Sequence, residues 1–355
     1  MLLIMFLIYT SSFHRQNKIY HVFYGLHQLV FIFYILAFLH PLGCFVKSSV
    51  DGHCKGYSSL FYALPTFLIF SYERLFLREI KTRFMPPVVL IQALKHSSQT
   101  LELRFEKPFH YTSGQYLYLH VSQLSLLEWH PFTITSCHQE SFLSLHIKCL
   151  GDWTKALNQL LSVPFHDPPR FLLYGPFDAP AQKLFQYKIA ILISTGIGVT
   201  PAASLLKSYW YSSGTCTLEK LYFIWINRRP EDFSWFQSLL ARLEEKMPLS
   251  RLEIQCFMTG NLDLPSIYNL SLQSQFDPKM DSLTRLKSLT RYGRPRWIPL
   301  LQKIKDAHTP VSGTFTLGVF YCGPPALSKV ISNASKAIAK ADPRVQFKQH
   351  DEYFN

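Results

Sequence analysis

The sequence predicts a multi-domain membrane protein in which α-helical transmembrane segments precede an antiparallel β-barrel and an α/β domain with a parallel sheet. Three observations predict this order: long apolar stretches within about the first 80 residues, segments of alternating polarity from about residue 84, and apolar runs separated by helical segments from about residue 187. A length of 355 residues suits two or three domains. We therefore expect a membrane region at 1–82, a barrel at 83–182 and the α/β domain at 183–355.

Two apolar stretches near the N-terminus are long enough to cross a bilayer. Residues 22–43 carry no charge, and residues 58–77 are nearly as apolar up to Glu73. Each approaches the ~20 residues that a spanning helix needs. Residues 1–10 are apolar but shorter. Because no basic segment or A-x-A cleavage pattern accompanies them, we interpret them as the end of a membrane helix rather than a signal peptide.

Basic residues lie at the outer ends of both stretches. They are His14, Arg15 and Lys18 before the first stretch and Arg74, Arg78, Lys81 and Arg83 after the second. The positive-inside rule therefore makes both flanks cytosolic, and residues 44–57 face outward. Cys44 and Cys54 lie in this outer loop, where they either form a disulfide in an oxidising compartment or stay unpaired.

The bulk composition excludes few functions. The net charge of +13 suits a surface that faces anionic lipid or an anionic ligand, but nucleic-acid binders share this charge, so it names no partner. The seven cysteines contain no CxxC pair, which argues against a zinc site or a dithiol motif.

The barrel is predicted by two half-buried strands, QYLYLHV (115–121) and LSLHIKCL (143–150), in which apolar and polar residues alternate. Between them lies HPFTITS (130–136), which places a histidine, a proline and three hydroxyl residues at one strand edge. Ordinary turn chemistry would explain this composition. Contact with a flavin would also explain it, with His130 and Thr133 beside the ring.

A second motif, HIKCLGDWT (146–154), favours the flavin interpretation. Lys148 supplies a cation for a pyrophosphate, and a glycine turn precedes Trp153 and Thr154. The two motifs together are more specific for a flavin than either one alone.

Four continuous apolar runs predict the buried strands of the α/β domain. They lie at 188–194, 220–227, 252–258 and 317–322, and helical segments are expected at 201–210, 232–246 and 326–341. Alternation of strands with helices implies a parallel sheet that is covered on both faces. Residues 260–300 are polar and are assigned to no element.

The motif STGIGVTP (194–201) follows the first of these strands and opens a helix. Gly196 and Gly198 allow the backbone to approach a phosphate, and Pro201 suits a first helical turn because its missing N–H is no loss there. The helix N-terminus offers free N–H groups to a pyrophosphate. Proline stands where the usual fingerprint has a third Gly or Ala, so a tight turn without a ligand is the alternative.

Two further motifs lie at strand ends. Arginines in NRR (227–229) can grip a 2′-phosphate and would favour NADP over NAD, unless they form a solvated basic turn. CGPPAL (322–327) ends the last strand, so Cys322 either faces the ligand crevice or is a buried structural cysteine.

The order of HPFT, GDWT, GIGVTP, IWINR, GRPRW and CGPPAL resembles the cytosolic half of the NADPH oxidase family, within the ferric reductase and ferredoxin–NADP reductase superfamily. The similarity runs from about residue 1 to the C-terminus. It implies a ferredoxin reductase-like pair of domains that bind FAD and NADPH, fused to a haem-bearing membrane bundle. The matching flavin residues are His130, Pro131, Phe132, Thr133, Lys148, Trp153 and Thr154; the matching dinucleotide residues are Gly196, Gly198, Thr200, Pro201, Arg228, Cys322, Gly323 and Pro324.

The resemblance also implies two catalytic candidates, Cys322 and Phe354. Phe354 matches an aromatic residue that closes over the flavin in the family, although Asn355 follows it here. No EF-hand loop is present, so direct calcium control is not expected.

His27 and His40 are the candidate haem ligands, because ionisable groups inside a span are costly and usually functional. They lie thirteen residues apart, or ~20 Å along a helix, so each could ligate a different haem b. Thirteen residues is ~3.6 turns, so the pair does not share one helix face, and snorkelling interfacial histidines are the alternative. The family takes its second ligand for each haem from a third span. This chain is expected to begin inside the fourth, which leaves haem ligation incomplete.

The resemblance implies an NADPH oxidase that transfers electrons from NADPH through FAD, and through haem in a complete protein, to oxygen, producing superoxide or hydrogen peroxide. A ferric-chelate reductase and a truncated regulatory isoform that passes no electrons are the alternatives. The implied location is the plasma membrane or an internal membrane, with both cofactor domains cytosolic. Candidate partners are the lipid bilayer, a small membrane subunit and cytosolic activators, and no nucleic acid is expected.

Overall fold

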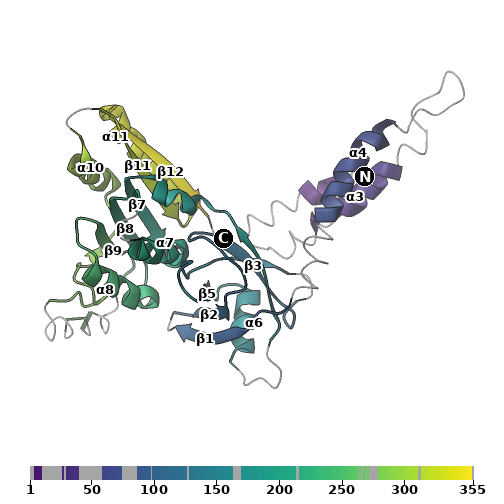
Figure 1. The fold of residues 1–355 in the computed structure, drawn as a ribbon, viewed down its shortest axis with the longest axis horizontal. Helices are drawn as coiled ribbons and strands as arrows, with labels where there is room; N and C mark the ends of the chain where they lie inside the picture. Colours follow the sequence, from purple (N-terminus) through teal and green to yellow (C-terminus); the bar gives the residue numbers. More distant parts are fainter. Residues whose placement is uncertain are drawn as a thin grey trace, which may run out of the picture. The chain divides into compact units, whose positions relative to one another are not determined.

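A computed structural model describes most of the chain after residue 85 and short helical pieces before it. The described residues are 4–9, 26–27, 29–39, 58–73, 86–96, 98–125, 128–162, 169–212, 216–262, 264, 267–268, 270–271, 279–310 and 313–353. The chain divides into two compact units, Met1–Met85 and Pro86–Asn355. Figure 1 shows the elements of each unit.

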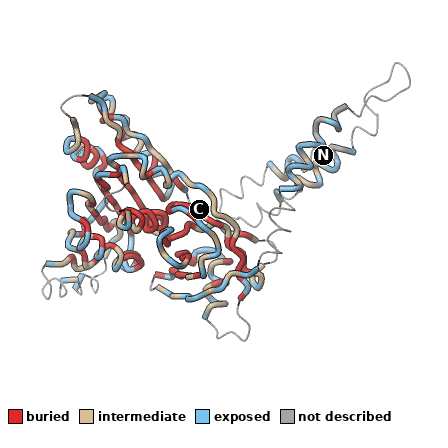
Figure 2. The backbone as a smooth tube through the Cα atoms, in the orientation of Figure 1, coloured by how far each residue is buried: buried red, intermediate tan, exposed pale blue. Residues whose placement is uncertain are grey.

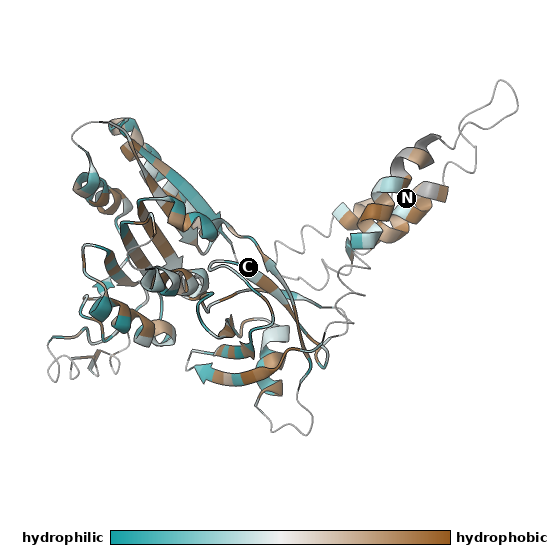
Figure 3. Cartoon of the chain, viewed as in Figure 1, coloured by the Kyte–Doolittle hydropathy of each residue, from teal (hydrophilic) through white to brown (hydrophobic). Residues whose placement is uncertain are grey.

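The described residues of the first unit include the apolar helices α3 (Leu29–Leu39) and α4 (Ser58–Ser71). Aromatic rings join them: the ring centroids of Phe31 and Phe70 are 5.4 Å apart, and those of Tyr34 and Phe67 are 5.6 Å apart. Both helices are predominantly apolar along their described lengths (Figure 3).

Within the part of the chain that the structure describes, every helix is too short or too polar to cross a membrane. Parts of both predicted spans, at 22–25, 40–43 and 74–77, lie outside the described residues. The membrane-spanning part of the fold therefore stays a prediction.

The second unit begins with two antiparallel three-stranded sheets. One has the order β1-β2-β5 and consists of β1 (Leu90–His96), β2 (Thr100–Glu106) and β5 (Phe142–Lys148); the other has the order β4-β3-β6 and consists of β4 (His130–Thr133), β3 (Tyr116–Val121) and β6 (Phe171–Phe177). Bridges from Val88 to Phe171 and from Ile134 to Leu145 join the two sheets. Helix α6 (Asp152–Leu160) follows β5. The antiparallel β-sheet domain predicted for this part of the chain is thus confirmed.

Alternation along β2 explains which face of its sheet is buried in the barrel. Leu101, Leu103 and Phe105 are fully buried in the barrel core. Because successive side chains of a strand point to opposite faces, Glu102 and Arg104 lie on the other face of the same sheet. This polar face carries a cluster that is described below.

The rest of the second unit is an α/β domain around one parallel sheet of order β10-β9-β8-β7-β11-β12. Its strands are β7 (Ile189–Thr195), β8 (Lys220–Asn227), β9 (Leu252–Met258), β10 (Arg291–Tyr292), β11 (Phe315–Cys322) and β12 (Val345–Glu352). Its helices are η3 (Pro180–Gln186), η4 (Gly196–Val199), α7 (Thr200–Tyr211), η5 (Pro230–Phe236), α8 (Gln237–Lys246), α10 (Trp297–His308) and α11 (Pro325–Ala341). The predicted parallel sheet is confirmed.

Both faces of this sheet are covered, which explains why its central strands are continuously apolar. Leu192 on β7 packs into the core formed with α7 and α8, whereas Ile191 and Ile193 pack into the core formed with α10 and α11. Buried residues are concentrated in the central strands in Figure 2.

The sequence left two regions of this domain unassigned. β12 was missed because VQFKQHDE is polar at most positions, as befits a strand at the edge of a sheet. The second region is the polar stretch around Asp281. The buried carboxylate of Asp281 accepts hydrogen bonds from the backbone N–H groups of Thr284 and Thr290, both at 2.8 Å. A single buried acceptor therefore organises a segment in which hydrophobic periodicity gives no signal.

Candidate cofactor-binding site

The strand order places a topological switch point between β7 and β11. From β7 the chain proceeds through β8 to β9 on one side, whereas β11 and β12 lie on the other side. Ligands of open α/β sheets bind at the carboxyl ends of the strands beside such a point. The predicted motifs STGIGVTP and CGPPAL follow β7 and β11, so the fold brings them to this place.

Gly198 and Cys322 are in close contact at the switch point. A Cβ added to Gly198 would lie 2.4 Å from the backbone oxygen of Cys322 and 3.1 Å from its Sγ. No side chain fits at this distance, so position 198 requires glycine. The two predicted motifs are therefore packed directly against each other at the carboxyl ends of β7 and β11.

Cys322 is a buried thiol and is only 3% exposed. Burial raises the pKa of its thiol well above the ordinary value, and the nearby Glu352 carboxyl adds to the shift. A thiol of this kind stays protonated at neutral pH and is a poor nucleophile. Both interpretations of Cys322 from the sequence, a ligand-facing residue and a buried structural one, agree with its place at the end of β11.

The remaining residues of the two motifs shape the backbone at the strand ends. Thr200 Oγ1 donates to Ile197 O at 3.1 Å, inside the turn that begins α7, and Pro201 occupies the first turn of that helix. Tyr321 Oη donates to Pro324 O at 2.9 Å. A Cβ at Gly323 would lie 1.9 Å from Thr195 Oγ1, so this glycine also permits a close approach of two chain segments.

The carboxyl end of β8 contributes Asn227 and Arg228. Both side-chain polar atoms of Asn227 are buried, and neither has a hydrogen-bond partner among the described residues. Such orphaned groups cost free energy unless a ligand or water satisfies them. Gly260, which the sequence interpretation missed, lets the segment after β9 approach the segment after β8 closely. A Cβ at this position would lie 2.0 Å from Arg228 O.

The motif GRPRW reaches the same edge of the sheet. Gly293 N donates to Met258 O at 2.8 Å at the end of β9, immediately after Tyr292 pairs with Met258. Arg294 and Arg296 that follow are exposed. The sequence interpretation quoted this motif without assigning a residue to it, and its position at the carboxyl end of β9, the strand beside β8, makes Arg294 a further candidate cation.

The flavin motif HPFT forms strand β4 and contacts the second flavin motif. The ring of His130 lies 4.2 Å from that of Trp153, and the ring of Phe132 lies 6.1 Å from it. Pro131 is exposed and Thr133 is buried. The fold therefore unites HPFT with GDWT, as the flavin interpretation requires.

Trp153 and Thr154 lie in the first turn of α6. Thr154 Oγ1 accepts a hydrogen bond from Gly151 N at 3.1 Å and donates to Gly151 O at 2.9 Å, so it closes the glycine turn. Trp153 is 6% exposed, and its Nε1–H has no acceptor among the described residues. This buried donor is suited to an acceptor from outside the chain.

Lys148, the predicted pyrophosphate cation, is engaged within the protein. Its Nζ donates to Asp232 Oδ1 on η5 at 3.2 Å and lies 5.0 Å from the Trp235 ring centroid. Arg229 Nη2 donates to the same oxygen at 3.2 Å. One carboxylate therefore contacts a cation from each cofactor domain.

Further polar contacts join the barrel to the α/β domain. Ser204 on α7 donates to Ser136 O at 2.7 Å, and Lys207 donates to Glu140 Oε2 at 3.1 Å. The indole N–H of Trp235 donates to the hydroxyl of Ser98. The two cofactor domains are thus held together within one compact unit.

A buried polar cluster lies on the outer face of sheet β1-β2-β5. Glu102 Oε2 lies 3.2 Å from His96 Nε2 and 3.6 Å from His146 Nε2, and Arg104 Nε donates to Glu102 Oε1 at 2.7 Å. Burial alone would raise the pKa of Glu102, but these partners outweigh it and lower that pKa to about 2. Burial lowers the pKa of His146 to about 3, against the attraction of Glu102.

Glu352 is a further residue that the sequence interpretation missed. It ends β12 directly opposite Cys322, and its Oε1 accepts a hydrogen bond from Ala181 N at 2.8 Å. Burial raises the pKa of this carboxyl to about 7, and the Ala181 hydrogen bond only partly opposes the shift. Recognising residues 345–352 as a strand would have placed Glu352 beside the last motif.

Two other predicted site residues cannot be placed with these. His40 and Phe354 lie outside the described residues. His27 lies in a short described helical piece, with an exposed side chain. The predicted haem ligands and the aromatic lid therefore stay predictions.

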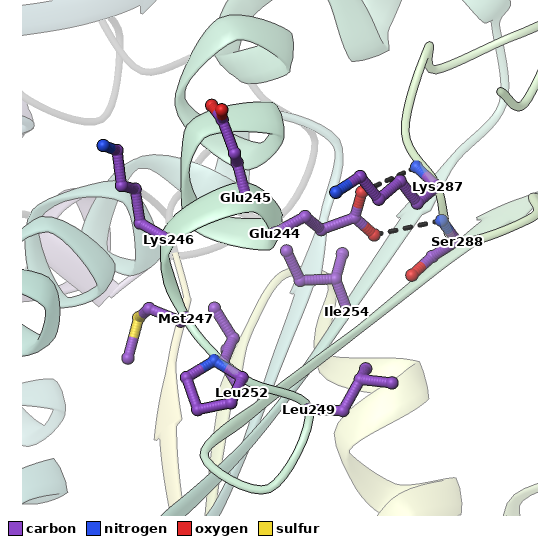
Figure 4. A pocket seen from close by; sticks show the side chains of 10 residues that line it. Glu244, Glu245, Lys246, Met247, Leu249, Leu252, Ile254, Lys287 and Ser288 are labelled. Carbon is purple, nitrogen blue, oxygen red and sulfur yellow. Dashed lines mark hydrogen bonds between the residues drawn. The ribbon is translucent and has the colours of Figure 1, made fainter.

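A hollow of about 560 Å³ lies away from these motifs, at the amino end of β9. Its lining includes Met247, Leu249 and Leu252. Figure 4 shows the Glu244 carboxylate accepting hydrogen bonds from the backbone N–H groups of Lys287 and Ser288. Because cofactors of parallel sheets bind at the carboxyl ends of strands, this hollow is unsuited to the dinucleotide.

Comparisons with known proteins identify the families of both domains of the second unit. Residues 84–193 match the FAD-binding domain family, and residues 187–336 match the ferric reductase NAD binding domain family. The ferredoxin NADP+ reductase from Neisseria gonorrhoeae, solved with bound FAD and NADP, has a TM-score of 0.50 at 16% identity over 74% of this chain and 97% of that one. A flavohemoglobin from Malassezia yamatoensis has a TM-score of 0.51 at 15% identity over 97% of this chain and 78% of that one. These likenesses confirm the ferredoxin reductase-like fold.

Curated relatives are similar over almost the whole chain. NADPH oxidase 1 of Rattus norvegicus is 34% identical over 99% of this chain and 67% of its own length. NADPH oxidase 3 of Homo sapiens is 34% identical over 98% of this chain and 67% of its own length. A superoxide-generating NADPH oxidase heavy chain of Dictyostelium discoideum is 34% identical over the full chain, which spans 52% of that relative. This chain therefore spans between about half and two thirds of the length of these relatives. It belongs to the NADPH oxidase family, as the order of its motifs predicts.

Proposed function

We propose that this chain binds FAD and NADPH in its second unit and passes electrons from NADPH through FAD toward molecular oxygen. The observation that carries the proposal is the contact of Gly198 with the backbone of Cys322 at the switch point. This contact brings the two motifs together at the carboxyl ends of β7 and β11, where a pyrophosphate and a nicotinamide would lie.

The residues at the strand ends fit NADPH. Gly198 lets the two motifs pack together at the strand ends, where helix α7 also begins, and helix N-termini favour phosphate groups. Asn227 offers a buried donor and a buried acceptor that lack partners among the described residues. Arg228 and Arg294 would supply cations for a 2′-phosphate, which supports a preference for NADPH over NADH.

The barrel residues fit FAD. The tilted rings of His130 and Trp153, with centroids 4.2 Å apart, would provide an aromatic platform, and the indole N–H of Trp153 is a buried donor without an acceptor among the described residues. Phe132 extends the platform. We propose that His130, Pro131, Phe132 and Thr133 line the flavin and that Trp153 and Thr154 shape the turn beneath it.

FAD, when bound, accepts a hydride from NADPH and releases electrons one at a time. The chain would orient the reactants: Gly198 and Gly323 permit the motifs at the strand ends to pack together, and Cys322 would lie beside the nicotinamide as a protonated thiol. Buried packing around Cys322 excludes water from this place. Glu352, opposite Cys322, holds a proton at Oε2 up to about pH 7.

Oxygen is the proposed final acceptor, because the curated relatives are named as NADPH oxidases. On the basis of the family, we propose that a complete protein transfers electrons across a membrane through haem b, with His27 and His40 as ligands. On the same basis, we propose that the protein lies in a membrane with its cofactor domains in the cytosol. A small membrane subunit or cytosolic proteins would activate it.

Gly198→Val tests the dinucleotide site. We expect it to abolish NADPH-driven dye reduction and NADPH binding while bound flavin is retained, because the added side chain would clash only at the switch point. Retained flavin shows that the variant folds. If Gly198→Val reduces the dye at the wild-type rate, the site assignment is wrong. Comparing oxygen with ferric chelate as acceptor in a complete protein separates an oxidase from a ferric-chelate reductase.

A further inference from the structure

We propose that His96, Glu102 and His146 form a binding site for a divalent transition-metal ion such as Zn²⁺, on the outer face of sheet β1-β2-β5. The metal-binding atoms are His96 Nε2, Glu102 Oε2 and His146 Nε2, all within 4.8 Å of one another. Imidazole and carboxylate donors are the usual ligands of a Zn²⁺ site that has an open position. The proposal is independent of the NADPH and FAD sites.

Two of the three separations between the donor atoms match tetrahedral coordination, and the third is at most 4.8 Å. With metal–ligand bonds of ~2.1 Å, two ligand atoms of a tetrahedral site lie ~3.4 Å apart. The Oε2 of Glu102 lies 3.2 Å from His96 Nε2 and 3.6 Å from His146 Nε2. The three ligands therefore surround a position that a metal ion could take with small movements of side chains, and a water molecule would complete the coordination.

Groups behind the ligands hold two of them in position. Thr135 Oγ1 lies 2.9 Å from His146 Nδ1, which leaves the Nε2 of that ring for a metal. Arg104 Nε donates to Glu102 Oε1 at 2.7 Å, which leaves Oε2 for the same purpose. Partners of this kind orient the ligands of known metal sites and tune their affinity.

The sheet places these residues together through cross-strand pairing. His146 on β5 lies directly opposite Glu102 on β2, and His96 ends β1 where it pairs with Thr100. The three strands lie side by side (Figure 1). Glu102 and His146 are 7% and 6% exposed, so the position is largely dry, and His96 is the ligand nearest to solvent.

The site lies at the contact between the barrel and the α/β domain. The ring of Phe236 on η5 is 4.5 Å from that of His146, and two residues further along β5 Lys148 pairs with Asp232 on the same turn. An ion held by three strands beneath η5 would brace this contact. We therefore assign it a structural role and not a role in the redox chemistry.

The sequence argued against a zinc site because it lacks a CxxC pair, and that argument covers only cysteine ligands. The proposed ligands are separated by 5 and 43 residues and follow no short motif. Only the pairing of β1, β2 and β5 unites them.

Metal binding by the full chain, purified without a polyhistidine tag, tests the proposal. We expect Zn²⁺ to bind with a Kd that rises at least ~100-fold in His96→Gln, because loss of a direct ligand should exceed the 10–100-fold cost of losing an outer partner. His110→Gln removes an exposed histidine outside the cluster and should bind like the wild type. Equal affinity in His96→Gln and the wild type, or no Zn²⁺ binding by the wild type, would overturn the site and leave a hydrogen-bonded cluster only.

A second measurement needs no variant and so does not depend on how His96→Gln folds. X-ray absorption of the wild type carrying one equivalent of Zn²⁺ should show nitrogen and oxygen neighbours with the scattering pattern of two imidazoles. Sulfur neighbours at ~2.3 Å would place the ion on cysteines and contradict the proposal.

Discussion

Lys148 Nζ lies 3.2 Å from Asp232 Oδ1, so an ion pair joins strand β5 of the barrel to the turn η5 of the α/β domain. Arg229 Nη2 lies 3.2 Å from the same carboxylate oxygen. The carboxylate is 5% exposed, so its charge is little screened by water. Asp232 therefore holds one cation from the proposed flavin side and one from the proposed dinucleotide side.

Asp232→Asn should strengthen the preference for NADPH over NADH. Removal of the carboxylate would free Arg229 and leave more positive charge near Arg228, where a 2′-phosphate is proposed to bind. We expect the ratio of kcat/KM for NADPH to that for NADH to rise roughly 5-fold, or about 1 kcal/mol. Steady-state kinetics with both dinucleotides measure this ratio.

Glu231→Gln is the matched control for Asp232→Asn, because it removes the neighbouring carboxylate, which forms no ion pair within the described part of the chain. It should leave the ratio unchanged. A ratio that stays constant in Asp232→Asn, or rises equally in Glu231→Gln, would mean that the Asp232 carboxylate does not restrain the dinucleotide cations.

Gly260→Ala should weaken NADPH binding and lower stability. The added Cβ would lie 2.0 Å from Arg228 O, so the ends of β8 and β9 must separate. We expect KM for NADPH to rise and the free energy of unfolding to fall by about 1–3 kcal/mol. Gly151→Ala is the control, since its Cβ would meet nothing within 4 Å. Equal stability of the two variants would contradict the close approach at Gly260.

Cys322 should resist alkylation in the folded protein. Its thiol is buried and has a raised pKa, whereas Cys216 is half-buried. Iodoacetamide at mildly alkaline pH should therefore modify Cys216 well before Cys322, and unfolding in urea should remove the difference. Mass spectrometry of peptides after timed quenching measures both rates. Rapid modification of Cys322 in the folded chain would show that it is exposed and reactive.

Glu352 should make the protein less stable as the pH rises. Burial raises the pKa of its carboxyl from 4.5 to about 7, so between these values the folded state holds a proton that the unfolded state has lost. The free energy of unfolding therefore falls as pH rises through this range, by up to about 3 kcal/mol, and the loss is complete above the folded pKa.

Glu352→Gln should remove this contribution while its side-chain oxygen still accepts the Ala181 hydrogen bond. Urea unfolding of the wild type and the variant at about pH 5 and about pH 8.5 gives the difference, which isolates Glu352 from other titrating groups. The exposed Glu245→Gln should behave like the wild type. If the free energies of unfolding of the wild type and Glu352→Gln differ by the same amount at both pH values, the pKa of Glu352 is not raised in the folded state.

The sequence predicted the architecture of the second unit because its signals are periodic. Alternation in QYLYLHV and LSLHIKCL gave β3 and β5, and apolar runs gave β7, β8, β9 and β11. The glycine motifs were found from their residue types, although the requirement for glycine at Gly198 comes from a tertiary contact with Cys322. Polar edge strand β12 gave no such signal, and Glu352 was missed with it.

Contacts between residues distant in sequence could not be predicted from local patterns. Lys148 was assigned to a pyrophosphate because a cation follows the flavin motif, but its partner Asp232 lies 84 residues away in a different domain. Glu102 and His146 likewise meet only through strand pairing. The sequence thus predicted which motifs lie at the strand ends, whereas the tertiary fold determines how the charges near them are paired.

Anaerobic mixing of the flavin-loaded chain with NADPH tests whether the second unit passes electrons from the dinucleotide to the flavin. We expect the visible absorption of the oxidised flavin to disappear, faster with NADPH than with NADH. We expect Gly198→Val to keep the flavin but to lose this reaction. A chain that retains no flavin, or whose bound flavin stays oxidised in excess NADPH, would contradict it.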